Sequence, residues 1–303
     1  MGRFSSKVLN KLWWSFHVNE RLRVWDDERY LKLLYRMRIG HSLDLENPAT
    51  FNEKLQWLKV YDHNPLYTML VDKAEVKAWV AERIGWEYIV PTLGIWESFE
   101  QIDFSSLPES FVLKCTHDSG GLAICRSRST FDIASTRAKI ERSLAKNYYW
   151  SGREWPYKNV RPRIIAEEYL SSRQSDDLTD YKFMCFNGAV RCAFTCTGRA
   201  KRDLRVDFFD PEWNHLPFTR HYPNAEIPPK APLLLREMIT MSEILAESIP
   251  FVRVDFYEVD GRAYFGELTF FPGSGMEEFD PEYWDFELGS WLDLPKCFEE
   301  MAF

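Results

Sequence analysis

The stretch that most constrains the fold lies near the C-terminal end of the 303-residue chain. Residues 251–271, FVRVDFYEVDGRAYFGELTFF, form two apolar, aromatic-rich runs joined by an Asp-Gly dipeptide. Such runs around a turn dipeptide predict a β-hairpin. Alternate residues of a strand share a face, so Val252 and Val254 should face the core while Arg253 and Asp255 face the other way.

The length of the hairpin loop sets which side chains meet. The loop EVDGR suits a three-residue turn with a glycine bulge, which places Arg253 opposite Glu267. That register puts four polar side chains on one face: Arg253, Asp255, Glu267 and Thr269. A two-residue Asp-Gly turn would shift the parity and send Glu267 to the other face. We therefore expect the loop length to decide whether the two acids meet.

The chemistry of this face suits a magnesium ion and a phosphoryl group. Asp255 and Glu267 offer hard oxygens, and the Thr269 hydroxyl is a third candidate donor. Arg253 beside them can stabilise charge on a transferring phosphoryl group. The alternative is a solvated strand face with an Arg253 to Glu267 ion pair of little energetic consequence. The motif alone leaves both interpretations open.

Two lysines upstream are candidates for phosphate binding. Lys114 interrupts the strand-like run FVLKC, which comes directly before the loop THDSGG with Gly120 and Gly121. The backbone N–H groups of such a loop can fold over phosphates while the lysine supplies a point charge. Lys73 follows Asp72, an expected helix N-cap, where a cation opposes the helix dipole and an anionic ligand would explain its place. The alternative for both lysines is simple solvent exposure, which is the more common reason for a lysine at such positions.

Two further pairs of charged residues lie on expected strands. Glu167 and Glu168 end the apolar run RIIAEEYL, so one of them points to each face and is able to accept hydrogen bonds from a nucleotide. Asp180 and Lys182 share a face in TDYKFMCF, where they serve a ribose and a phosphate or only each other.

The rest of the chain predicts an α+β protein. Helical patterns dominate residues 20–70, where Thr50-x-x-Glu53 is a capping box. A smaller unit of strands and helices follows, and then a larger one rich in antiparallel strands, with a hairpin expected at Asn187-Gly188.

Composition excludes some classes of function. The formal charge of -8 argues against nucleic-acid binding. No apolar run reaches the roughly 20 residues of a membrane span, no signal peptide is apparent and the cysteines form no CxxC pair, so we expect a cytoplasmic protein. Residues 1–40 mix basic and aromatic side chains; they either contact the inner face of a membrane or pack on the main body.

Five motifs in order resemble the ATP-grasp superfamily, and more narrowly its TupA-like branch of teichuronopeptide biosynthesis. They are VDKAEVK, FVLKCTHDSGG, IIAEEYL, DYKFMCFNG and RVDFYEVDGRAYFGELTFFPGSG, and the resemblance covers about residues 50 to 295. It implies two α+β lobes that clasp ATP: a helical region over 1–70, a small lobe over 71–165 and a large lobe over 166–303.

The resemblance also implies roles for individual residues. ATP would be bound by eight of them: Lys73, Lys114, Gly120, Gly121, Glu167, Glu168, Asp180 and Lys182. Asp255 and Glu267 would hold Mg²⁺, and Arg253 would act in the transition state. Many relatives have asparagine where this chain has Thr269, so the resemblance does not supply a third metal ligand.

The implied activity is ATP-dependent ligation of a carboxylate to an amine through an acyl phosphate. By analogy the carboxylate belongs to a uronic-acid-containing sugar or sugar nucleotide, and the amine to an amino acid or amino alcohol, in surface polysaccharide biosynthesis. The alternatives are a glycan kinase of the same fold, a glycosyltransferase, or a non-catalytic nucleotide-binding partner of a glycan-assembly complex.

Overall fold

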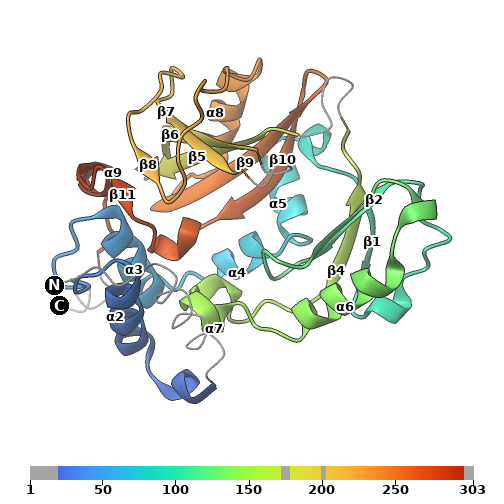
Figure 1. Cartoon of the computed structure of the whole chain (residues 1–303), viewed down its shortest axis with the longest axis horizontal. Coiled ribbons are helices and arrows are strands. Elements are labelled where there is room, and N and C mark those ends of the chain that lie inside the picture. The colour runs from blue at the N-terminus through green and yellow to red at the C-terminus, as the bar shows by residue number, and fades with distance from the viewer. Residues whose placement is uncertain (1–19, 172–177, 199–202, 297–303) are drawn as a thin grey trace.

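Two antiparallel β-sheets organise the protein, which a computed structural model describes over residues 20–171, 178–198 and 203–296 (Figure 1). The larger sheet consists, in spatial order, of β10 (Arg262–Thr269), β9 (Phe251–Val259), β5 (Asp180–Phe186), β6 (Ala189–Thr197) and β7 (Arg205–Phe209). The smaller sheet consists of β1 (Thr92–Trp96), β4 (Ile164–Glu168), β2 (Phe111–Cys115) and β3 (Leu122–Cys125). A two-stranded ribbon pairs β11 (Phe279–Asp280) with β8 (Thr219–Arg220). The predicted α+β class is confirmed.

Helices precede, link and follow these sheets. The α-helices are α2 (Asp27–Arg38), α3 (Phe51–Tyr61), α4 (Leu66–Val71), α5 (Val76–Ile84), α6 (Ile133–Leu144), α7 (Tyr149–Gly152), α8 (Leu235–Leu245) and α9 (Tyr283–Trp291). Short 3-10 turns are η1 (Glu20–Val24), η2 (Trp86–Tyr88), η3 (Phe99–Gln101), η4 (Arg128–Thr130), η5 (Trp155–Tyr157) and η6 (Pro272–Gly275). The expected helical N-terminal region is therefore present over its described part, while residues 1–19 lie outside it.

Local signals explain where several elements begin and turn. Thr50 accepts a hydrogen bond from the backbone N–H of Glu53, whose carboxylate accepts one from the Thr50 N–H, so the predicted capping box starts α3. Asn187 and Gly188 both have positive φ, which gives the two-residue turn expected between β5 and β6.

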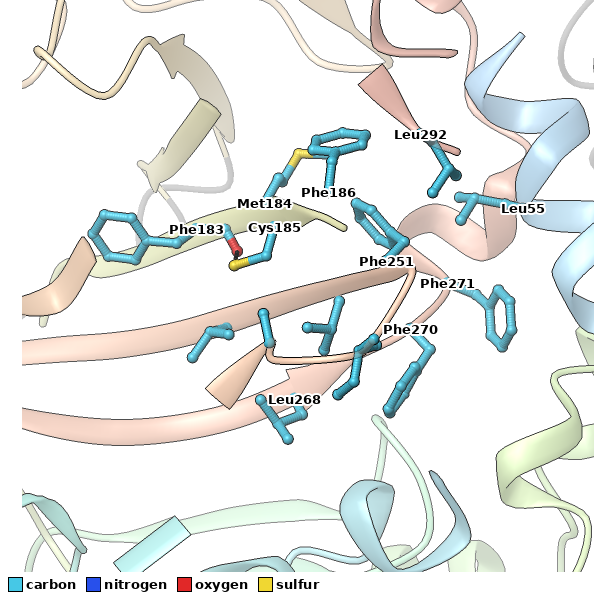
Figure 2. Packing of buried hydrophobic residues seen from close by; sticks show 14 of the residues in the cluster. Leu55, Phe183, Met184, Cys185, Phe186, Phe251, Leu268, Phe270, Phe271 and Leu292 are labelled. Carbon is cyan, nitrogen blue, oxygen red and sulfur yellow. Dashed lines mark hydrogen bonds between the residues drawn. The ribbon is translucent and has the colours of Figure 1, made fainter. Parts of the chain in front are cut away.

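Two separate hydrophobic cores support the two sheets. The smaller sheet packs with α6 around Phe111, Leu113 and Ile140. The larger core joins the larger sheet to α8 and also to the N-terminal helices. Figure 2 shows Leu55 of α3 beside Leu292, next to the sheet end that carries Phe251. Because burial of apolar area is the main favourable term in folding, this shared core fixes α3 against the larger sheet.

The sheets also suggest where one lobe ends and the next begins. β4 runs to Glu168; it pairs with β2 over its whole length and with β1 from Ile164 to Glu167. A division after residue 165 would cut this strand. We therefore propose that the small lobe extends to Glu168, three residues beyond the boundary expected from the sequence.

Candidate active site

The polar face of the larger sheet gathers charges from three neighbouring strands. Arg253 Nε lies 2.6 Å from Asp255 Oδ1, and its Nη2 lies 2.7 Å from Asp255 Oδ2 and 2.9 Å from Glu267 Oε1. Lys182 on β5 stands opposite Asp255 and contacts its Oδ2, and the Lys182 Nζ lies 2.6 Å from Asp180 Oδ2. Arg253, Asp255, Lys182 and Asp180 are each less than 10% exposed. The structure thus brings these five predicted side chains together.

The hairpin reaches this arrangement by a different turn from the one predicted. Val259 pairs with Arg262, and both Asp260 and Gly261 have positive φ, so the loop has two residues rather than three. The pairing is then interrupted between Phe265 and Glu267. The three-residue loop was wrong, and so was the expectation that a two-residue turn would separate the acids.

A bulge at Gly266 resolves this difference. The extra residue restores the parity, so that Glu267 stands opposite Asp255 and Thr269 opposite Arg253. A Cβ atom on Gly266 would lie 3.1 Å from the backbone oxygen of Asp255 and 3.3 Å from its Cβ. A glycine at this position therefore lets the two strands approach closely where the polar side chains converge.

The electrostatic environment keeps both carboxylates ionised at neutral pH. Burial raises the pKa of Asp255 to about 6, against the opposing pull of Arg253 and Lys182. Burial also disfavours the Glu267 anion, but Lys73, Arg253 and Lys182 outweigh it and lower the Glu267 pKa to about 2. Asp255 and Glu267 raise the pKa of the Arg253 guanidinium although burial opposes its charge.

The glycine loop between β2 and β3 lies across from this cluster. Lys73 Nζ donates to the backbone oxygen of Asp118 at 2.5 Å, and Asp118 Oδ1 accepts from the Gly121 N–H at 2.9 Å. A Cβ atom on Gly121 would lie only 2.4 Å from Cys115 Sγ, so glycine is required there. Gly120 has no such constraint, because its nearest neighbour would be Asp118 Oδ2 at 3.9 Å.

Glu167 is held by two lysines. Its Oε1 lies 2.5 Å from Lys77 Nζ and its Oε2 lies 2.6 Å from Lys114 Nζ. Burial disfavours the anion, but Lys114 and Lys77 together lower the Glu167 pKa. Both oxygens are thus occupied by cations, whereas Glu168 is exposed. Lys114 lines the cleft while its ammonium group is paired with Glu167.

One cleft of about 340 Å³ collects most of the predicted residues. It is lined by Lys73, Lys114, Gly121, Asp180, Lys182, Arg253 and Glu267. Gly120, Glu167, Glu168 and Asp255 are not among the described residues that line it. The side chains of Phe194, Val206 and Phe208 add an apolar floor from β6 and β7.

Two basic residues at this site escaped the sequence analysis. Lys77 follows Lys73 by four residues, a helical spacing that signals a shared face. Arg220 lines the cleft from the two-residue strand β8 and donates to the Pro272 carbonyl at 2.7 Å. Arg220 carries no signal in the sequence, because its short strand has neither a motif nor a clear alternation.

The oxygen donors near the hairpin fit a magnesium ion in part. Asp255 is engaged by Arg253 and Lys182 through both oxygens, whereas Glu267 bonds through Oε1 and lines the cleft. Thr269 is turned to Glu267, with 3.4 Å between its Oγ1 and Oε1. Within the described ranges no three His, Cys, Asp or Glu side chains form a ready metal site. Mg²⁺ often takes one or two carboxylates plus phosphate oxygens, and Glu267 suits that mode.

A comparison with known proteins assigns the chain to a family. A family model described as TupA-like ATPgrasp matches residues 53–293. The chain belongs to the TupA-like ATP-grasp family. The ATP-grasp fold expected from the five motifs is therefore confirmed, and the match runs from within α3 through both sheets to the end of α9.

Solved structures with similarity to this TupA-like chain are distant. The D-Alanine-D-Alanine ligase from Helicobacter pylori is 16% identical with a TM-score of 0.41, over 74% of this chain and 62% of that one. The D-alanine--D-alanine ligase from Bacillus anthracis is 14% identical with a TM-score of 0.42, over 88% and 84%. The ATP-grasp ligase PsnB with a phosphomimetic precursor variant, Mg and ADP is 12% identical with a TM-score of 0.39, over 72% and 57%. The chain thus spans less than two thirds of the Helicobacter and PsnB structures.

Neither a curated relative nor, within the described ranges, a membrane-spanning helix is found. No curated protein matches the sequence. Along the described part of the chain, no helix is both long and apolar enough to cross a membrane.

Proposed function

We propose that this protein is an ATP-dependent carboxylate–amine ligase that forms an amide through an acyl phosphate. The observation that carries the proposal is one cleft that is lined both by Arg253, Lys182 and Glu267 and by Lys73, Lys114 and Gly121. The lysines and Arg253 that line this cleft suit a polyphosphate. Glu267 lies among them and is the carboxylate best placed to bind a metal ion together with the phosphate oxygens.

The chemistry proceeds in two steps. An oxygen of the substrate carboxylate attacks the γ-phosphorus of ATP, and the bond to the β-phosphate oxygen breaks to release ADP. The amine nitrogen then attacks the acyl carbon, which expels inorganic phosphate, and the nitrogen loses a proton. Positioning and electrostatics supply most of the rate in such a phosphoryl transfer, so no side-chain nucleophile is needed.

The residues of the cleft divide these tasks. Lys114 and Lys182 hold the phosphates, with Lys73 and the Gly120-Gly121 backbone covering them. Arg253 stabilises the transferring phosphoryl group and then the tetrahedral species. Mg²⁺ held by Glu267 and Asp255 would neutralise the phosphate oxygens.

The contacts described above change two of the expected roles. Glu167 acts by fixing Lys114 and Lys77. Glu168, which is exposed, is then the acid of this pair that is able to hydrogen-bond to the nucleotide at the hinge. Asp180, which lines the cleft, is paired with Lys182 and acts by holding that lysine in place. Both assignments are proposals that variants at these positions can separate.

The proposed substrates rest on the resemblance to the TupA-like branch. We propose a uronic acid, free, nucleotide-linked or within a glycan, as the carboxylate, and an amino acid or amino alcohol as the amine. The apolar floor of Phe194, Val206 and Phe208 supports a ring-bearing substrate, because sugars pack against apolar and aromatic faces. We place the reaction in surface polysaccharide biosynthesis, in the cytoplasm or at the inner face of the membrane.

The test is a screen for ADP release across uronic acids and amines, with Mg²⁺ present. We expect ADP release that requires one carboxylate and one amine together, and a product mass equal to the two substrates minus water. A product heavier by one phosphoryl group would instead identify a glycan kinase. Turnover of a sugar nucleotide without ATP would identify a glycosyltransferase, and the absence of any turnover would support a non-catalytic partner.

A further inference from the structure

A polar stripe on α3 is buried against the loop that follows β10. Asn52, Gln56 and Lys59 recur at helical spacing, and each has no exposed surface. Helices usually bury apolar side chains, and a buried polar group without partners is unfavourable. The hydrogen-bond partners of these three side chains should therefore explain why polar residues are buried here.

Gln56 and Lys59 donate to one turn of the loop. Gln56 Nε2 lies 3.1 Å from the Ser274 carbonyl oxygen and 2.8 Å from that of Gly275. Lys59 Nζ lies 2.8 Å from the Ser274 carbonyl oxygen and 3.0 Å from its hydroxyl. Lys59 also donates to Gln56 Oε1 at 3.0 Å, so the two side chains act as one unit. Figure 1 shows η6, which contains this turn, beside α3.

The turn needs such support because its backbone is unusual. Gly273, Ser274 and Gly275 all have positive φ, at 59°, 56° and 57°. The left-handed region is disfavoured for a serine, and such conformations persist where surrounding contacts fix them. A Cβ atom on Gly275 would lie 2.5 Å from Gln56 Nε2, so the glycine is required for this contact with α3.

The opposite side of the same loop faces the cleft. Pro272, Gly273 and Glu277 line it, and Arg220 binds the Pro272 carbonyl at 2.7 Å and Glu277 Oε2 at 2.8 Å. The loop begins three residues after Thr269, at the end of the strand that carries Glu267. Residues 272–277 thus separate α3 from the part of the cleft where we propose that the phosphoryl group is transferred.

We propose that Gln56 and Lys59 are positioning residues for the ligase reaction, which they serve by holding residues 272–277 as a rigid wall of the cleft. This inference rests on the function proposed above for the same cleft. It assigns a task to the helical N-terminal region, whose own residues do not line the cleft within the described ranges. An error of about 1 Å in such a wall is enough to slow a reaction about 100-fold.

Charges around Lys59 are consistent with this task. The negative charges of Glu154, which is buried, and of Asp27 favour the ammonium form of Lys59. The Ser274 hydroxyl, which contacts Lys59, also hydrogen-bonds to Glu154 and so links the two charges. Burial lowers the Lys59 pKa to about 8 while both acids oppose the shift, so the ammonium form prevails at pH 7.

The experiment compares Lys59→Met and Gln56→Leu with a control on the same helix. Lys54→Met is that control, because Lys54 Nζ donates to the carbonyls of Gly289 and Leu292 at the end of α9, at 2.8 and 2.7 Å. Each variant removes polar contacts from α3, but only the first two remove contacts to the loop. If Lys59→Met fails to fold, Gln56→Leu, which deletes no charge, carries the test.

Amide hydrogen exchange of a peptide covering residues 270–279 is the first measurement, since it needs no substrate. We expect exchange at least tenfold faster in Lys59→Met and Gln56→Leu and unchanged in Lys54→Met. Affinity for Mg²⁺ with a non-hydrolysable ATP analogue should stay within twofold in all three. With an active substrate pair, kcat should fall tenfold or more in the first two, with the KM for ATP within twofold.

Three outcomes would overturn the inference. Wild-type exchange in both test variants would mean that the loop is held elsewhere. An equal loss of kcat in Lys54→Met would reduce the effect to general stability. Faster exchange together with full kcat would show that the shape of the wall does not matter. If no substrate pair gives turnover, that failure belongs to the proposed function, and the exchange measurement still decides whether α3 holds the loop.

Discussion

The substitution Glu167→Gln tests how Lys114 is held at the cleft. In the wild type one carboxylate, with a side chain 7% exposed, joins Lys77 and Lys114, whose side chains are 11% and 25% exposed. The amide keeps the shape but leaves two ammonium groups without their counter-charge. Lys77 stays in place, because it also donates to the Val90 carbonyl at 2.7 Å and to Thr92 Oγ1 at 2.9 Å.

The expected loss of stability follows from this geometry. Removing one partner from a fully buried ion pair costs about 3–5 kcal/mol. Lys114 is able to turn toward water, so its share is discounted and we expect about 2–3 kcal/mol for the free energy of unfolding. At about 2–4 °C per kcal/mol, the melting temperature should fall by about 4–12 °C.

The assay is thermal and urea unfolding of Glu167→Gln beside Glu168→Gln. The neighbouring acid is exposed and should change neither midpoint measurably. The pH dependence gives a second check. Since the folded Glu167 pKa is lowered, its contribution is present above the unfolded pKa near 4.5 and fades as the pH falls below it. Equal midpoints for the two variants, or a difference that persists at low pH, would refute the reasoning.

Three further predictions concern the hairpin and α3. Asp255→Asn and Glu267→Gln should each lose Mg-dependent ATP turnover by at least 100-fold while remaining folded by circular dichroism; full turnover in both would contradict the metal assignment. Gly266→Ala should lower turnover about tenfold or more, because its Cβ would press on the Asp255 backbone at 3.1 Å, and unchanged kinetics would show that the bulge adapts. Because the folded Lys59 pKa is about 8 and that of an ordinary lysine is 10.5, the unfolded chain binds more protons between these values. Wild-type stability relative to Lys59→Met should therefore rise by up to about 3 kcal/mol over that pH range in urea unfolding.

Local sequence signals predicted the elements whose partners lie close in the chain. The capping box at Thr50 and Glu53 and the turn at Asn187 and Gly188 each involve residues within a few positions of one another. Their geometry depends on the backbone of those residues alone, so a single sequence is enough to predict it.

Contacts between distant segments were harder to predict. The Asp-Gly sequence is compatible with a loop of two or three residues. The two acids meet on one face with the two-residue loop only because the bulge at Gly266 restores the parity farther along the strand. Glu167 looked like a nucleotide contact because its partner Lys77 lies 90 positions away. The role proposed for Gln56 and Lys59 was not predicted either, because their partners also lie far away in the sequence. A polar stripe on a helix normally predicts a solvated face.

The bulge at Gly266 divides the hairpin into an inner and an outer segment. The pairs from Arg253 to Asp255 follow one register and those from Phe256 to Val259 another. Changes at the outer tip therefore do not have to propagate to the charged cluster. The tip at Asp260 and Gly261 is exposed, which makes it a suitable point for inserting a short peptide tag or attaching a fluorophore without disturbing that cluster.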